Sequence, residues 1–122
     1  MDVKQLLIDT IASFNYPIYQ QGSLSNDTEY PDSFFTYFNN STNDDAFFDN
    51  NETRTIWDFD LNIYSLDPDI VNNTLIQAKP LLKAAGFIVN GVGYDALSDE
   101  QTHTGRGINI LYIEKVRYTQ HG

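Results

Sequence analysis

A strict alternation of apolar and polar side chains in residues 54–64 constrains the fold more than any other feature of this sequence. The apolar positions are Trp57, Phe59, Leu61 and Ile63, and the polar positions between them are Asp58, Asp60 and Asn62. Because successive side chains of a strand point to opposite faces, this pattern predicts a β-strand. One face of that strand should be buried in a core, and the other should meet water.

Two segments have the periodicity of a helix. Apolar side chains in residues 2–14 fall on one stripe, and Pro17 ends the segment. A second apolar stripe follows Asp67 and Pro68, which are typical of an N-cap and a first helical position.

This second helix should stop at Gly86, because glycine readily takes the backbone conformation that ends a helix. Pro80 lies within the stripe and lacks a backbone donor, so we expect a kink or a short break there.

The remaining segments predict further strands and complete the element order α-β-β-β-α-β-β. The strands are expected at residues 17–22, 33–39, 87–94 and 108–118, with a polar loop at 95–107. We therefore predict an α+β fold, in which two helices pack on one face of a mostly antiparallel sheet of about four to five strands. The chain, residues 1–122, fits a single domain with a flexible C-terminal tail after about residue 117.

Aromatic side chains occupy both faces of the strand predicted at 33–39. A strand that is apolar on both faces is covered on both, either by its own core or by a neighbouring chain. The candidate subunit or partner interface in this strand is therefore Phe34, Phe35, Tyr37 and Phe38.

Residues 39–53 are predicted to form a long polar loop that carries Phe47 and Phe48. A loop of this length is uncommon in a compact domain unless it has a use. The two phenylalanines are therefore a candidate anchor for a partner, although they could also tuck against the adjacent strands.

The net charge of −10 argues against direct binding of nucleic acid, because only seven basic residues are present and they form no cluster. An acidic surface is compatible with DNA that slides past without binding, and also with simple solubility. Cysteine is absent, which excludes disulfides and thiolate chemistry. The acidic N-terminal start and the lack of a long apolar run predict a cytoplasmic protein without a membrane segment.

Three patterns suggest chemistry, but each is incomplete. Asp58 and Asp60 share one face of a strand, as in some metal-dependent nucleases, but a third carboxylate and a lysine are not apparent. Residues 43–52 are rich in the oxygen ligands that calcium prefers, yet they lack the spacing and the glycine of an EF-hand loop. Ser98, Asp99 and His103 are close only in sequence, whereas a catalytic triad is assembled from distant positions.

We therefore predict no catalytic residue, no metal site and no cofactor. The triplet Gly105-Arg106-Gly107 is too short for a phosphate-binding loop, and we interpret it as a flexible turn before the last strand. The polar loop at 95–107 instead offers candidate contacts for a partner, namely Asp99, His103 and Arg106.

Five segments together form a distinctive pattern across most of residues 16–115. They are Tyr-Pro-Asp-Ser-Phe-Phe-Thr-Tyr-Phe-Asn-Asn at 30–40, Ile-Trp-Asp-Phe-Asp-Leu-Asn-Ile-Tyr-Ser at 56–65, Leu-Leu-Lys-Ala-Ala-Gly-Phe at 81–87, Gly-Tyr-Asp-Ala-Leu-Ser-Asp-Glu at 93–100 and Thr-His-Thr-Gly-Arg-Gly at 102–107. The pattern resembles the tail-completion proteins, also called tail terminators or head–tail joining proteins, of long-tailed siphophages and prophages of Gram-positive bacteria.

The resemblance implies a structural virion protein with a small α+β fold and no catalytic residues. It implies a homo-oligomeric ring, usually a hexamer, that caps the tail tube and joins it to the head connector. The partners would be other copies of the chain, the tail tube protein and the connector or stopper protein. DNA would pass through the central channel without specific binding, and the protein would lie at the head–tail junction after assembly in the host cytoplasm.

Three other functions fit parts of the sequence. The chain could be a connector stopper or a minor capsid component of the phage neck. It could be an acidic inhibitor that mimics DNA, although its carboxylates are diluted by asparagine, serine and aromatic residues. A metal-dependent hydrolase built on Asp58 and Asp60 is the remaining alternative.

Overall fold

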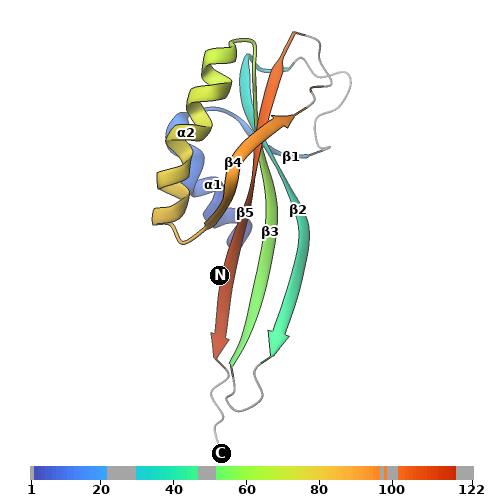
Figure 1. Cartoon of the computed structure of the whole chain (residues 1–122), viewed down its shortest axis with the longest axis vertical. Coiled ribbons are helices and arrows are strands. Elements are labelled where there is room, and N and C mark those ends of the chain that lie inside the picture. Colours follow the sequence, from blue (N-terminus) through green and yellow to red (C-terminus); the bar gives the residue numbers. More distant parts are fainter. Residues whose placement is uncertain (1, 22–29, 47–51, 97, 99–101, 118–122) are drawn as a thin grey trace, which may run out of the picture.

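Figure 1 shows the computed structural model of the chain, which describes residues 2–21, 30–46, 52–96, 98 and 102–117. Within these residues the fold is α+β, as the sequence predicts, with two α-helices and a five-stranded sheet. In chain order the elements are α1 (Val3–Ile11), the 3₁₀ turn η1 (Ala12–Phe14), β1 (Ile18–Gln20), β2 (Ser33–Ala46), β3 (Glu52–Ser65), α2 (Pro68–Ala84), β4 (Ile88–Ala96) and β5 (Thr104–Arg117).

The strands lie in the order β1-β2-β3-β5-β4, so β3 is the central strand of the sheet. The short strand β1 runs parallel to β2, and the other neighbouring pairs are antiparallel. The last strand in the chain, β5, lies between β3 and β4. The predicted mostly antiparallel sheet is confirmed.

The predicted start of α2 is confirmed, because the side chain of Asp67 accepts a hydrogen bond of 2.9 Å from the backbone N–H of Asp69. Pro68 is at the first helical position. The short break expected at Pro80 does not occur, and α2 continues to Ala84. Because Pro80 has no backbone N–H, the carbonyl of Ile76 loses its usual helical hydrogen bond. Both residues are exposed, so water can hydrate that carbonyl instead.

One face of the sheet packs against both helices and forms the core. The predicted core face of β3 is confirmed, since Phe59, Leu61 and Ile63 are fully buried, whereas Asn62 on the face predicted to meet water is only 6% exposed. The other core side chains come from both helices, from β2 and β5, and from the segment after α2: Val3, Leu7, Ile11, Phe35, Tyr37, Val71, Leu75, Ala78, Leu82, Phe87, Ile108 and Ile110. Each helix therefore contributes one apolar stripe to a single core.

The long loop predicted at 39–53 is wrong, because strands β2 and β3 occupy most of it. After an irregularity between Asn39 and Ser41, β2 stays paired with β3 as far as Ala46 opposite Thr53. Asn and Asp are depleted in strands, so this segment is typical of a loop, but backbone pairing with β3 does not depend on side chains. Residues 47–51, with Phe47 and Phe48, lie outside the described residues.

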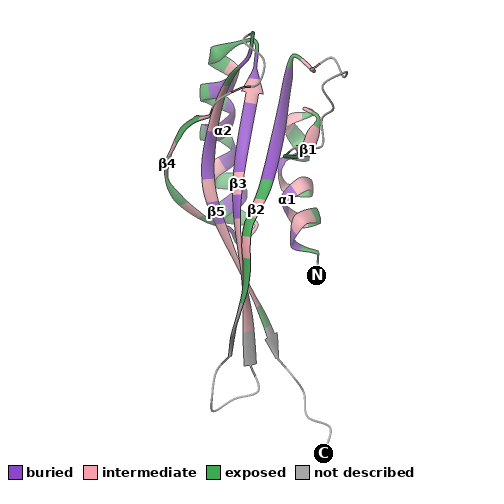
Figure 2. Cartoon of the chain, turned by 90° about the vertical axis from the view of Figure 1, so that its right-hand side faces the viewer, coloured by how far each residue is buried: buried purple, intermediate pink, exposed green. Residues whose placement is uncertain are grey.

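The strands β2, β3 and β5 extend beyond the two helices as a narrow arm, visible at the lower end of Figures 1 and 2. We define the arm as residues 43–46, 52–56 and 113–117, which are paired in register. Figure 2 shows that buried residues concentrate in the upper part of the sheet, next to the helices. The chain therefore has a packed body and a thin, three-stranded extension.

Substitutions at two neighbouring positions of α2 test which face of this helix packs against the sheet. Leu75 is 2% exposed and Ile76 is 64% exposed. We expect Leu75→Ala to lower the free energy of unfolding by about 2–5 kcal/mol, because it removes core contacts and leaves a cavity. Ile76→Ala should change that free energy by less than about 0.5 kcal/mol. Urea unfolding followed by circular dichroism measures both, and equal effects would contradict the assigned packing of α2.

Candidate functional site

The face of the sheet opposite the helices, which we call the open face, carries most of the polar side chains of the central strands. Paired residues of neighbouring strands share a face, so the register Phe38–Asp60–Asn109 places these three side chains in one row. Asp58 lies in the adjacent row on the same face. The predicted common face of Asp58 and Asp60 therefore lies at the centre of the open face.

An asparagine amide bridges the two carboxylates. The Asn109 Nδ2 group donates to Asp58 Oδ1 at 2.6 Å and to Asp60 Oδ1 at 3.2 Å. Asn109 is itself held by Asn90, whose Nδ2 donates to Asn109 Oδ1 at 2.7 Å, and Asn40 donates to Asp58 Oδ1 at 3.2 Å. The carboxylates thus have amide donors as partners, and the position between them is filled by an N–H group.

Among the described residues, no group of three or more His, Cys, Asp or Glu side chains could hold a metal ion. A metal-dependent hydrolase built on Asp58 and Asp60 would need further ligands and an open coordination position. The amide of Asn109 lies within hydrogen-bond distance of both carboxylates.

Tyr94 of β4 lies beside the carboxylates and is partly buried. Partial burial of the phenol, together with the charge of Asp60 and a hydrogen bond to it, raises the pKa of Tyr94 to about 12. The protonated phenol therefore donates to Asp60 throughout the neutral range. This contact ties the edge strand β4 to the central strand β3.

Gly105 and Gly107 lie inside β5 and not in the flexible turn that the sequence suggests. A Cβ atom at Gly105 would lie 2.6 Å from the ring of Tyr64, and one at Gly107 would lie 2.8 Å from the ring of Tyr94 and would overlap Asn62 Oδ1. The two glycines therefore make room for large side chains of the neighbouring strands. The spacing of the two glycines, with one residue between them, could have indicated this arrangement, because residues i and i+2 of a strand lie on the same face.

An aromatic cluster occupies the end of the open face next to the start of β2. The ring of Phe34 stacks on Tyr64 at 5.3 Å between centroids and has edge contacts with its other neighbours. The members of the cluster are Tyr19, Tyr30, Phe34, Tyr64 and His103. Phe34, predicted as an interface residue, is 2% exposed because this cluster covers it.

His103 is a buried member of that cluster and is held by hydrogen bonds. It is 8% exposed, and its Nε2 donates to the carbonyl oxygen of Pro31 at 2.8 Å, since a carbonyl oxygen can only accept. Its Nδ1 lies 3.0 Å from the Thr102 hydroxyl. Asp99, the acid of the possible triad and a candidate contact, lies outside the described residues. His103 therefore fastens two segments together and offers little surface to a partner.

The other predicted interface residues divide between core and surface. Phe35 is 0% exposed and Tyr37 is 8% exposed, because the helices cover that face of β2, so neither is available to a partner. Phe38 points to the open face and is 46% exposed. Of the four aromatic residues in this strand, Phe38 alone has a large exposed surface.

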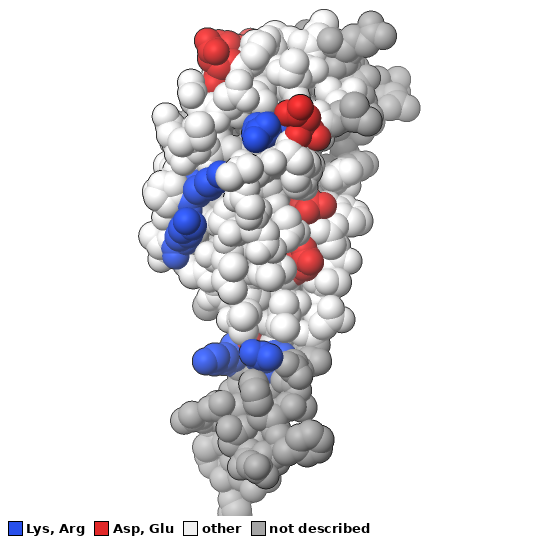
Figure 3. Space-filling model, viewed as in Figure 1, with Lys and Arg blue, Asp and Glu red and all other residues white. Residues whose placement is uncertain are grey.

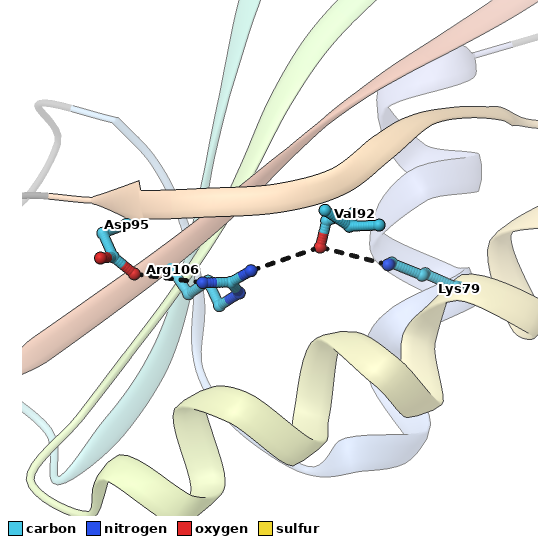
Figure 4. Close-up of polar contacts among 4 residues, drawn as sticks. All are labelled: Lys79, Val92, Asp95 and Arg106. Carbon is cyan, nitrogen blue, oxygen red and sulfur yellow. Dashed lines mark hydrogen bonds and ion pairs between the residues drawn. The ribbon is translucent and has the colours of Figure 1, made fainter.

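Arg106 also has a role within the chain, shown in Figure 4. Its guanidinium pairs with Asp95 at 3.1 Å and reaches the carbonyl oxygen of Val92 at 3.5 Å. The ammonium of Lys79 on α2 donates to the same carbonyl at 3.2 Å. The register of β4 with β5 shifts between Asn90 and Tyr94, so these two cations hold the irregular segment of the edge strand.

An open pocket of about 400 Å³ lies between the first turns of α2 and the neighbouring ends of β4 and β5. Of its described lining residues, Asp95 is paired with Arg106 and His103 is bound to Pro31. These groups already have partners within the chain. The open face remains the candidate functional surface.

No model of a known protein family matches this chain, and no curated protein sequence matches it. In the described part of the chain, neither helix has the length and apolar character needed to cross a membrane.

The glycine positions of β5 give a direct test of the open face. We expect Gly107→Ala to lower the free energy of unfolding by about 1–3 kcal/mol, because the added Cβ overlaps Asn62 and approaches Tyr94. In an Asn62→Ala background the same substitution should cost less, because the nearer obstacle is gone. Urea denaturation of the four proteins of this cycle measures the coupling. The same cost in both backgrounds would contradict the contact.

The raised pKa of Tyr94 predicts a specific alkaline dependence of stability. The folded state holds this phenol proton more tightly than the unfolded chain, whose tyrosine has the ordinary pKa of 10.0. The contribution is therefore complete below pH 10 and is lost as the pH rises to about 12. Tyr94→Phe should lose less stability than the wild type over this interval, measured by urea unfolding at each pH. Parallel curves for the two proteins would contradict the assignment.

Proposed function

We propose that this chain is a structural virion protein of a long-tailed phage, which forms a ring that caps the tail tube and joins it to the head connector. The resemblance of five sequence segments to tail-completion proteins suggests this role. The observation that carries it is the three-stranded arm, which projects beyond the helices that cover the rest of the sheet (Figures 1 and 2). The proposal assigns no catalytic residue, metal or cofactor to the chain.

The arm contributes little to the stability of an isolated monomer. A strand rises about 3.3 Å per residue, so the five rows from Ile56 to Glu52 project on the order of 15 Å. A ribbon of this width has no core of its own and gains little stability in water. Contact with another subunit would cover it and would compensate for the ordering of its backbone.

Both edges of the arm are also open to a partner. In the described residues β1 pairs with β2 only as far as Tyr37, and the pairing of β4 with β5 begins at Leu111. Beyond these points the outer edges of β2 and β5 have no neighbour among the described strands. Such edges present backbone donors and acceptors, on which a strand or loop of another subunit can pair.

The net negative charge of the chain is compatible with a position beside a channel through which DNA moves. A net charge of −10 repels phosphate groups, so a ring of such subunits would not retain DNA in its channel. In Figure 3 several acidic side chains lie along the right-hand side of the body, and another acidic group lies at its upper left. The proposed ring therefore needs no specific DNA contact.

Particles made without this protein test the proposal. If the chain completes the tail, a phage with the gene deleted should yield full heads beside tails that are unjoined or of abnormal length, seen by electron microscopy. Supplying the protein in trans should restore joined virions.

Joined virions of normal infectivity without the protein would contradict the role. Empty or unfilled heads with normal tails would instead favour a stopper or capsid function. Capture of a host DNA-binding protein, with no effect on particles, would favour the DNA-mimic alternative.

A further inference from the structure

The outward surface of α2 is basic and apolar, although the chain as a whole has a net charge of −10. After Asp69 in its first turn, the helix contains two lysines and no acidic residue. Residues at i, i+3, i+4 and i+7 lie on one stripe of a helix. The stripe that points away from the buried side of α2 contains Ile76, Lys79, Pro80 and Lys83, and we call it the α2 stripe.

The positive charge of the α2 stripe is not neutralised within the described chain. Lys83 is exposed and has no ion-pair partner among the described residues. Lys79 donates to the carbonyl oxygen of Val92, which is a neutral acceptor. Beside these lysines, Ile76 and Val92 are 64% and 77% exposed. In Figure 3 basic side chains lie over α2, on the left of the body. This surface therefore combines positive charge with exposed apolar side chains.

The open face, on the other side of the sheet, combines negative charge with exposed apolar side chains. The hydrogen-bond partners of Asp58 and Asp60 are side-chain amides and the phenol of Tyr94, which are neutral groups. In the described chain neither carboxylate forms an ion pair. Phe38 lies in the row of Asp60, and Ile88 lies in the row of Asp58. The side chains of Phe38, Tyr94 and Ile88 are 46%, 43% and 45% exposed.

We infer that the α2 stripe of one copy packs on the open face of the next copy. The inference rests on the proposed function for the identity of the partner, and it names the two surfaces that neighbouring subunits of the ring would share. The lysines would contact carboxylates and aromatic rings, which attract an ammonium group by charge and by cation–π interaction. The exposed apolar side chains of both surfaces would be buried in the same contact. Each sheet would then lie between its own helices and the α2 helix of a neighbour.

Charge also determines which surfaces can meet. Two open faces in contact would bring the carboxylates of both copies together, and two α2 stripes in contact would bring their lysines together. Like charges opposed across an interface are unfavourable, so both of these symmetric contacts are disfavoured. A contact between unlike surfaces leaves one surface free at each end of a pair. Such head-to-tail contacts close into a ring when the rotation between copies allows it.

Selective cross-linking tests the contact, because the chain contains no cysteine. Phe38→Cys marks the open face and Ile76→Cys marks the α2 stripe, and both positions are exposed. A short bis-maleimide should convert the purified double variant into a ladder of covalent oligomers on a denaturing gel. Each single variant should remain monomeric on the same gel. Dimers from a single variant would show a symmetric contact, and a double variant without intermolecular products would equally contradict the inference.

Charge variants test the same contact without cross-linking. Asp58→Asn with Asp60→Asn removes the negative charges of the open face and keeps oxygens that can accept hydrogen bonds. Ile76→Glu with Lys83→Glu places acidic side chains on the α2 stripe, where they would face the carboxylates of the next copy. Circular dichroism and urea unfolding establish that each variant is folded.

Two control variants make the same changes of net charge outside both surfaces. Asp9→Asn with Asp32→Asn matches the open-face variant, and Lys4→Glu with Gln20→Glu matches the α2 variant. Assembly is measured by native mass spectrometry and sedimentation velocity. The wild type should form rings or larger species that weaken as salt is raised. Each surface variant should assemble at least about tenfold more weakly, whereas both controls should behave like the wild type.

A mixture of the two surface variants should form one-to-one pairs that grow no further, because only one intact contact is possible between them. A mixture that stays monomeric would overturn the inference, and so would surface variants that assemble like the wild type or a wild type that stays monomeric. The particles without the protein decide the proposed function separately. Unjoined heads and tails together with unaffected surface variants would retain the function and reject this interface.

Discussion

The central strand β3 has one apolar and one polar face, and this difference determines how the other strands and the helices pack. On one face Phe59, Leu61 and Ile63 are fully buried against the helices, and burial of such a side chain contributes about 1.5–3 kcal/mol. On the other face Asp58 and Asp60 remain beside amide donors and water. A slip of one residue in register would exchange these faces and bury the carboxylates at a large cost. The alternation in β3 therefore sets the register of β2 and β5 as well as the side on which both helices pack.

The open face is ordered by contacts that involve little hydrophobic burial. Asn109 places one amide between two carboxylates, and the glycines of β5 admit the rings of Tyr64 and Tyr94 from the strands on either side. A face that only had to meet water would not require large aromatic rings to pack over glycines in this way. The same contacts hold the carboxylates of Asp58 and Asp60 in fixed positions on this face.

Much of the fold follows from sequence patterns that act locally. The apolar face of β3, the apolar stripes of the helices and the cap at Asp67 each have a direct physical cause, and the structure confirms them. The extension of β2 to Ala46 could not be predicted in the same way, because backbone pairing with β3 holds a polar segment that has weak strand preference.

The candidate site depends still more on topology. The common face of Asp58 and Asp60 is evident in the sequence, but Asn109 and Tyr94 join them only because β5 lies between β3 and β4. The apolar character of both faces of residues 33–39 is also evident. The sequence does not reveal which face lies under the helices, so it cannot separate Phe35 and Tyr37, which belong to the core, from aromatic residues available to a partner.

The position of β5 between β3 and β4 has a consequence for biosynthesis. Until the ribosome has translated β5, β3 has only β2 beside it among the described strands, and β4 has no described partner strand in the sheet. Residues as distant as Glu52 and Arg117 have to meet before the sheet is closed. A nascent chain therefore exposes the inner edge of its own central strand until β5 has been synthesised, and this interval is when chaperones or aggregation would compete with folding.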